Sequence, residues 1–178
     1  STQLSVHSPA ALSILKEKGF TRVVLSREMS FNQIADFCRK ARKMCIETEV
    51  FVHGALCMSL SGQCLLSSMI GQRSGNRGLC AGPCRLPFSA CGLNEKRYDL
   101  SLKDLSLISH INELKEIGVD SLKIEGRMKR PEYVAAATAV CRLRADGRKD
   151  SELEKNLMKI FSRLGFTDGY FTGIKGAE

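Results

Sequence analysis

The run Phe51-Val-His-Gly-Ala-Leu-Cys57-Met-Ser-Leu-Ser-Gly-Gln-Cys64 marks the point where a β-strand gives way to a cysteine-rich loop. A second run, Gly78-Leu-Cys80-Ala-Gly-Pro-Cys84-Arg85, follows it. The strand, residues 48–52, is indicated by its β-branched and aromatic side chains. The cysteines lie among glycines and serines that can turn the backbone sharply. Thiolates gathered in this way bind zinc or an iron–sulfur cluster, and their spacing alone does not distinguish the two.

Strands and helices alternate on both sides of this loop. Strands are predicted over residues 1–6, 21–26, 48–52 and 119–124, and helices over residues 10–18, 30–43, 102–117, 131–145 and 151–165. Alternation at this spacing is typical of parallel βα units in an α/β fold. Ser30 with Gln33, and Ser151 with Glu154, have the spacing of capping boxes that begin helices.

The whole chain is therefore expected to form a single partial domain. Its parts are βαβαβ over 1–53, the cysteine-rich loop over 54–100, helix–strand–helix over 101–146, and a C-terminal helix and tail over 147–178. A closed (β/α)8 barrel needs eight strands and about 250 residues, so four strands suggest roughly half of a TIM-like barrel. The sequence also begins within a predicted strand, which indicates a piece of a longer protein. Half a barrel leaves strand edges unpaired, and we expect this piece to form a homodimer.

Candidate catalytic residues follow the predicted strands, because functional groups in parallel barrels come from the carboxyl ends of strands. His53 ends one strand, and it is either a base or metal ligand or a hydrogen-bonded structural group. Lys123, Glu125 and Arg127 alternate at the end of another strand, so they point to one side. They form either a structural ion network or a ligand-binding group, in which the guanidinium of Arg127 would hold a carboxylate or phosphate.

Protease machinery is hard to find in the sequence. There is no His-Glu-x-x-His helix and no Gly-x-Ser-x-Gly turn. A cysteine nucleophile needs a nearby base, and His53 with Cys57 is the one arrangement of that kind which the sequence leaves open.

Composition suits an ordinary globular protein of a reducing compartment. The 178 residues are 43% hydrophobic and contain eight cysteines, and no apolar run approaches the length of a membrane span. Because nothing marks secretion, free thiols and a cytoplasmic location are expected rather than disulfides. A net charge of +8 favours a polyanion such as RNA, or an anionic small molecule, although a run of cations on one helix is also typical of a solvated face.

The string over residues 49–68 resembles the signature of the U32 family, historically called collagenase-like peptidases. The resemblance extends over nearly all of the chain, with a second specific stretch at Leu122-Lys-Ile-Glu-Gly-Arg127-Met-Lys. It implies the C-terminal half of the conserved barrel domain. Family members include proteins of RNA hydroxylation and accessory proteins of ubiquinone hydroxylation, some of which carry a [4Fe–4S] cluster.

What the resemblance implies for this chain is a [4Fe–4S] cluster on Cys57, Cys64, Cys80 and Cys84, with Cys91 as the rival for the fourth position. In a recombinant sample the cluster is expected to be lost readily or replaced by zinc. The implied function is iron–sulfur-dependent hydroxylation of RNA or a small aromatic molecule. The alternatives are peptide hydrolysis, as the family name implies, and a non-catalytic fragment that binds metal or nucleic acid.

Overall fold

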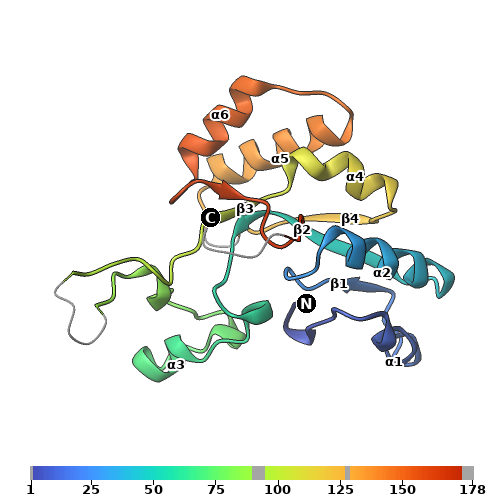
Figure 1. Ribbon diagram of the computed structural model, residues 1–178, viewed down its shortest axis with the longest axis horizontal. Helices are drawn as coiled ribbons and strands as arrows, with labels where there is room; N and C mark the ends of the chain where they lie inside the picture. Colours follow the sequence, from blue (N-terminus) through green and yellow to red (C-terminus); the bar gives the residue numbers. More distant parts are fainter. Residues whose placement is uncertain (1, 90–94, 127–128, 174–178) are drawn as a thin grey trace. The chain divides into compact units, whose positions relative to one another are not determined.

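The computed structural model describes residues 2–89, 95–126 and 129–173, and the chain divides into two compact units. The sheet unit comprises Ser1–Ala55 and Lys103–Glu178, and the cysteine unit comprises Leu56–Leu102. The described strands are β1 (Arg22–Val24), β2 (Glu47–Ala55), β3 (Asp104–Ser106), β4 (Ser121–Ile124) and β5 (Phe166–Thr167). The described helices are α1 (Leu12–Glu17), α2 (Phe31–Lys43), α3 (Leu66–Gly71), α4 (Ile111–Glu116), α5 (Pro131–Ala145) and α6 (Ser151–Ile160) (Figure 1).

Strand β2 is the centre of the sheet unit. It pairs in parallel with β1, where Val23 lies opposite Thr48, and in parallel with β4, where Leu122 lies opposite Val50. Its last residues pair antiparallel with β3, and β3 pairs in parallel with β5. The sheet is therefore mostly parallel, with one antiparallel pair, in a mixed α/β fold.

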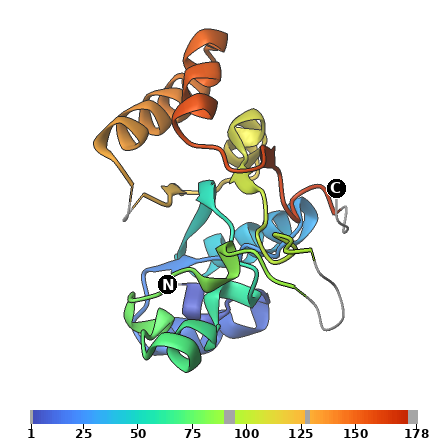
Figure 2. The same cartoon turned by 90° about the vertical axis from the view of Figure 1, so that its left-hand side faces the viewer.

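Helices α4, α5 and α6 gather on one side of this sheet, and α5 and α6 lie side by side in both views (Figure 1, Figure 2). The core between helices and sheet is apolar. Its fully buried side chains include Phe37, Val52, Ile111, Leu114 and Leu157. Burying apolar side chains of this kind stabilises a fold by about 25 cal/mol per Å² of apolar surface and is the main favourable term in folding.

The carboxyl end of β2 runs very close to the chain that follows β4. Gly54 has φ +133°, and a Cβ placed there would lie 2.6 Å from the Cβ of Glu125 and 2.9 Å from its carbonyl oxygen. The backbone N–H of Glu125 donates to the carbonyl of His53 at 2.8 Å. The pairing of β2 with β4 also shifts register between Phe51 and His53. Only glycine suits this position, because any side chain would force the two segments apart.

The local signals in the sequence predicted several elements correctly. The helix over 131–145 has the predicted bounds, and the strand over 48–52 lies within β2. The predicted capping box of α2 is confirmed, since the backbone N–H of Ser30 donates to Oε1 of Gln33 at 2.9 Å. The half-barrel remains a prediction, because the described strands establish only the mixed α/β sheet.

Three expectations about elements were wrong. Residues 2–4 of the predicted first strand form a 3₁₀ turn, and Ser5 then takes φ +49°. The carbonyl of Val6 accepts the N–H of Ser26. The predicted helix over 102–117 begins as β3, because Asp104–Ser106 pair with the end of β2, and α4 starts only at Ile111. Asp150, not Ser151, caps α6: its carboxylate accepts the N–H groups of Glu152 and Leu153.

Candidate metal centre

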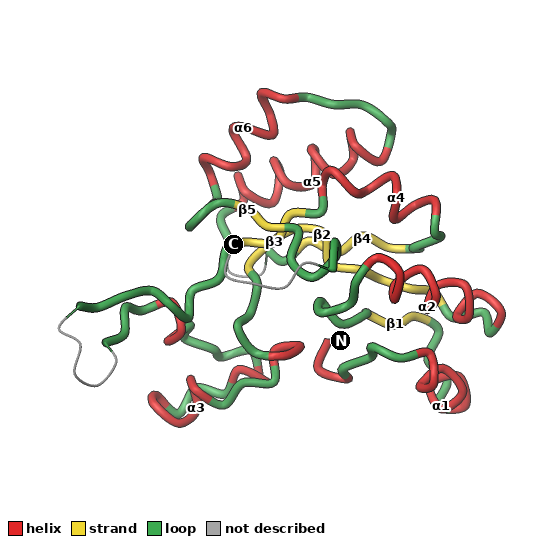
Figure 3. Tube along the Cα trace, in the orientation of Figure 1, coloured by secondary structure: helices red, strands yellow, loops and turns green. Residues whose placement is uncertain are grey.

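The cysteine unit is built from turns rather than from a large core. Its regular elements are α3 and short 3₁₀ turns, and loop makes up most of its trace (Figure 3). Side chains tie the turns together: the Ser67 hydroxyl accepts the N–H of Ala81 at 2.9 Å, and Nε of Arg73 donates to the carbonyl of Leu79 at 2.9 Å. Ser67 is buried, so its hydrogen bond stabilises the unit from within.

All four predicted cysteine ligands lie in this unit as free thiols. The turn at Gly75 brings two of them together, because a Cβ there would lie 3.5 Å from the carbonyl oxygen of Cys64 and 3.6 Å from the Cβ of Cys80. Burial raises the pKa of the Cys84 thiol, Arg85 lowers it, and the thiols of Cys57, Cys80 and Cys64 raise it further. The other three thiols are thus close enough to Cys84 to affect its pKa.

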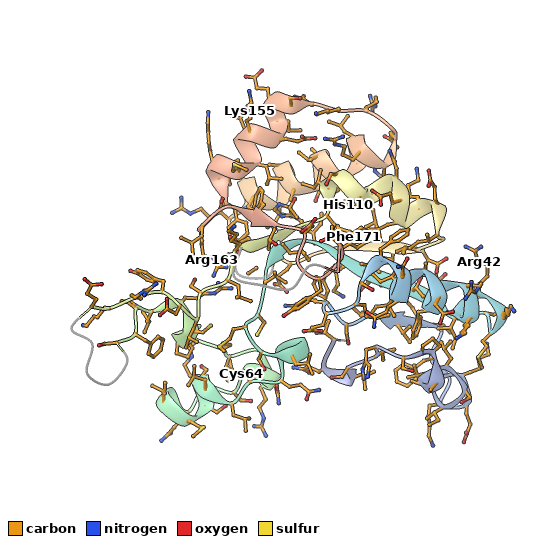
Figure 4. The ribbon with its side chains drawn as sticks, in the orientation of Figure 1. Arg42, Cys64, His110, Lys155, Arg163 and Phe171 are labelled. Carbon is orange, nitrogen blue, oxygen red and sulfur yellow. The ribbon has the colours of Figure 1, made fainter. Side chains whose placement is uncertain are left out.

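Two of the thiols already receive backbone hydrogen bonds. The N–H of Leu66 donates to Sγ of Cys64 at 3.4 Å, and the N–H of Gly82 donates to Sγ of Cys80 at 3.3 Å (Cys64 is labelled in Figure 4). Such donors stabilise a thiolate and tune a metal bound to it. Within the residues that the structure describes, no three His, Cys, Asp or Glu side chains are already gathered as a ligand set for a metal ion. The donor chemistry therefore fits a thiolate-bound metal or cluster, and binding would require the loops to close further.

Arg85 joins the two ends of the cysteine unit. Its guanidinium donates to the carbonyl of Leu102 at 2.8 Å, to the hydroxyl of Ser101 at 3.1 Å, and to the carbonyl of Leu56. Leu56 and Leu102 are the first and last residues of the unit. Arg85 directly follows Cys84, so the residue that closes the unit lies next in sequence to one of the four thiols.

His53 lies fully buried in the sheet unit. Its Nδ1 is 2.8 Å from the hydroxyl of Tyr133, and its ring contacts those of Tyr133, Phe161 and Phe166. Its Nε2 has no hydrogen-bond partner among the described residues. Burial lowers the pKa of His53 to about 4. The ring is thus neutral at physiological pH and a weak base.

We expect His53 to make the folded protein sensitive to acid. In the unfolded chain an ordinary histidine takes up a proton near pH 6.5, whereas His53 in the folded protein stays neutral down to about pH 4. Stability from this group is therefore complete above pH 6.5 and is lost as the pH falls to 4, by about 3 kcal/mol. Urea unfolding of the wild type and of His53→Asn, which keeps a polar atom for Tyr133, measures the difference. Parallel stability curves for the two proteins over this pH range would contradict the expectation.

Lys123 forms an ion pair with a residue of β2. Its Nζ lies 2.6 Å from Oε1 of Glu49, and the hydroxyl of Ser121 donates to Oε2 of the same carboxylate at 2.9 Å. Burial acts to raise the pKa of Glu49, but the hydrogen bonds from Lys123 and Ser121 hold that pKa below its usual value. Glu49 was not among the predicted site residues, because its partner is 74 residues away in the sequence.

The remaining predicted residues are placed as follows. Glu125 directly follows β4 and gives its N–H to His53. Arg127 and Cys91 lie outside the described residues. Arg27 follows β1, as the end of the predicted strand there suggested, and its guanidinium carbon lies 4.5 Å from the centre of the Phe51 ring. Nζ of Lys123 lies 5.5 Å from the same centre. Two cations thus share one aromatic ring near the carboxyl ends of β1, β2 and β4.

Together, the fold and the site define a mixed α/β protein with a cysteine-rich unit inserted between two strands. Residues 1–178 match the family model described as peptidase family U32, and the chain belongs to that family. The resemblance stated from the sequence is thereby confirmed. No solved structure matches the chain significantly.

Curated relatives carry several different names. The chain is 40% identical over 196 residues to tRNA hydroxylation protein P1 of Bacillus subtilis, which covers 100% of the chain and 46% of the relative. It is 35% identical over 201 residues to a collagenase of Porphyromonas gingivalis, covering 100% of the chain and 48% of the relative. It is 34% identical over 195 residues to a 23S rRNA 5-hydroxycytidine synthase of Escherichia coli, covering 99% of the chain and 29% of the relative. The chain thus spans less than half the length of each of these relatives. Among its described residues, no helix is both long and apolar enough to cross a bilayer.

Proposed function

We propose that this chain is part of an RNA hydroxylation protein in which Cys57, Cys64, Cys80 and Cys84 hold a [4Fe–4S] cluster. The observation that supports the proposal most directly is that all four cysteines are free thiols within one compact unit, where the turn at Gly75 lies against both Cys64 and Cys80. Isolated buried cysteines would not produce such a set, and Cys38 and Cys141 of this chain are examples of that ordinary kind.

The residues around the thiols have definite tasks in this proposal. Arg85 keeps the ends of the unit together and lowers the pKa of Cys84 against the effect of burial, which favours the thiolate that a metal needs. The N–H groups of Leu66 and Gly82 stabilise negative charge on two of the sulfur atoms. When bound, a cluster of this type supplies one-electron redox chemistry.

RNA is the favoured substrate for two reasons. Relatives that are 34–40% identical are named for the hydroxylation of tRNA or 23S rRNA. The chain also carries a net charge of +8, which attracts a polyanion through space. A small aromatic substrate, the half-barrel and self-association through unpaired strand edges remain proposals with less support.

Peptidase activity has a named relative in its favour, the collagenase of Porphyromonas gingivalis. The chain's own residues support it less. A cysteine nucleophile needs a base that can reach it and take its proton. The only histidine next to the cysteine unit in sequence is His53, whose ring is enclosed by aromatic side chains and whose pKa is lowered to about 4.

The proposal is tested with the full-length protein in a host that lacks its own copy of the gene. We expect RNA from complemented cells to contain a nucleoside heavier by one oxygen atom, measured by mass spectrometry of digested RNA. Cys57→Ser should abolish this product, whereas Cys45→Ser, an exposed cysteine of the sheet unit, should leave it unchanged. If the product persists in Cys57→Ser, or if only gelatin cleavage depends on Cys57, the hydroxylation proposal is wrong.

A further inference from the structure

A groove of about 430 Å³ lies in the sheet unit, between the α5–α6 pair and the edge formed by β3 and β5. Its floor is apolar and includes Leu157, which is fully buried, and Phe166. Phe166 also contacts the buried ring of His53, with the ring centres 5.0 Å apart. The groove is therefore anchored to the carboxyl end of β2 and is not a shallow feature of the helix surface. Its volume lies within the range of about 300–1,000 Å³ that is typical of ligand sites.

The walls of the groove carry positive charge and hydroxyl groups. Lys149 and Lys155 line it, and neither forms an ion pair with another residue that the structure describes. Lys155 lies on α6 (Figure 4). Three serines, Ser106, Ser109 and Ser151, add hydroxyl groups to the lining.

The acidic groups nearby do not cancel these lysines. The one carboxylate in the lining, that of Glu154, lies 2.7 Å from Nε of Arg144, so this pair is neutral as a whole. The carboxylate of Asp150, next in sequence to the groove, is occupied by the N–H groups at the start of α6. Two uncompensated ammonium groups thus face a cavity with an apolar floor.

We propose that this groove binds a segment of single-stranded RNA, with phosphates on Lys149 and Lys155 and a base over the apolar floor. The proposal rests on the proposed function, because it names where the RNA of that reaction is held. Lysine and hydroxyl groups are the usual partners of backbone phosphates, and these contacts position a nucleic acid without reading its sequence. Aromatic and apolar side chains accept any base by stacking, which suits a floor that includes Phe166.

The test measures binding of a fluorescent, short, single-stranded oligoribonucleotide to the whole chain by anisotropy at several salt concentrations. We expect the Lys149→Ala/Lys155→Ala double variant to lose about tenfold or more in affinity at low salt. The slope of log affinity against log salt should become shallower by about 1.4, which corresponds to two phosphate contacts on a single strand. The matched control is Arg142→Ala/Lys159→Ala, which removes the same charge from α5 and α6 outside the groove lining.

Each outcome decides for or against the groove. Loss in the groove variant with near wild-type binding in the control supports it. Equal losses in both variants would show a general charge effect, and an unchanged groove variant, or no RNA binding by the wild type, would also overturn it. Competition by poly-glutamate at equal charge concentration would reassign the groove to an acidic protein partner. RNA binding to the groove is measured without turnover. An absence of hydroxylated RNA in cells would therefore contradict the proposed function without contradicting RNA binding in the groove.

Discussion

The Cys64→Ser variant should bind almost no iron or sulfide when the protein is reconstituted without oxygen, whereas the wild type should bind four of each per chain as a [4Fe–4S] cluster. A serine hydroxyl stays protonated and is a poor ligand for iron, so losing one thiolate of four is expected to prevent a stable cluster. Cys64 is the sharpest choice, because its sulfur already accepts the N–H of Leu66 and its carbonyl lies against the turn at Gly75. Iron and sulfide analysis, with absorption and EPR spectra, gives the measurement.

Two further variants locate the fourth ligand and control the experiment. Iron that disappears in Cys84→Ser and stays in Cys91→Ser assigns the fourth position to Cys84, and the reverse assigns it to Cys91. Cys45→Ser should keep full iron, since Cys45 belongs to the sheet unit. Full iron content in Cys64→Ser would contradict the cluster assignment. If the wild type bound one zinc per chain and no iron under the same conditions, the site would be a structural zinc site instead.

Gly54→Ala should destabilise the sheet unit by on the order of 4 kcal/mol, because strain at its φ adds to a clash with backbone. The added Cβ would lie 2.9 Å from a carbonyl oxygen that cannot swing away without separating β2 from the chain after β4. Gly147→Ala is the matched control, as Gly147 also has positive φ, +72°, but no atom lies within 4 Å of its would-be Cβ. That substitution should cost about 1 kcal/mol, from the left-handed backbone alone. Urea unfolding of the wild type and the two variants separates the cost of the clash from the cost of the backbone conformation. Equal losses of unfolding free energy in the two variants would show that the close approach at Glu125 is unimportant.

The parts of the fold that the sequence predicted are those whose causes are local. Ser30 and Gln33 are three residues apart, so their hydrogen bond could be expected from spacing. Pro131 stands at the first position of α5, a position that proline favours. The strand at Asp104 was missed because its cause is distant. Its pairing partner is Ala55, and its buried carboxylate is held by Arg163, whose guanidinium lies 3.1 Å away. A three-residue repeat of apolar side chains in residues 105–114 fits a helix locally, and tertiary pairing overrides it at the first of them.

In the candidate site, too, the sequence predicted the features with local causes and not those with distant ones. The cysteines were recognisable because glycine-rich spacing and thiol chemistry are properties of a short stretch. The roles of Arg85 and His53 could not be recognised from the sequence. Arg85 binds the backbone carbonyls of Leu56 and Leu102, and a backbone carbonyl leaves no mark in the sequence. The aromatic side chains that enclose His53 come from residues 133–166, far along the chain from it. Burial converts a candidate base into a weak one, and burial depends on these distant residues.

The antiparallel pairing of β2 with β3 makes the whole cysteine unit, in topological terms, the loop of a β-hairpin. Ala55 lies opposite Asp104, so the chain leaves the sheet and returns to it at neighbouring positions, and Arg85 holds the two crossing points together. The register of the hairpin is set by its strands, through Gly54 opposite Leu105, and not by what lies between them. A module attached in this way can lengthen, shorten or change its side chains through evolution while its host keeps the same hydrogen-bond ladder. The cysteine unit and its scaffold can thus diversify independently within one architecture.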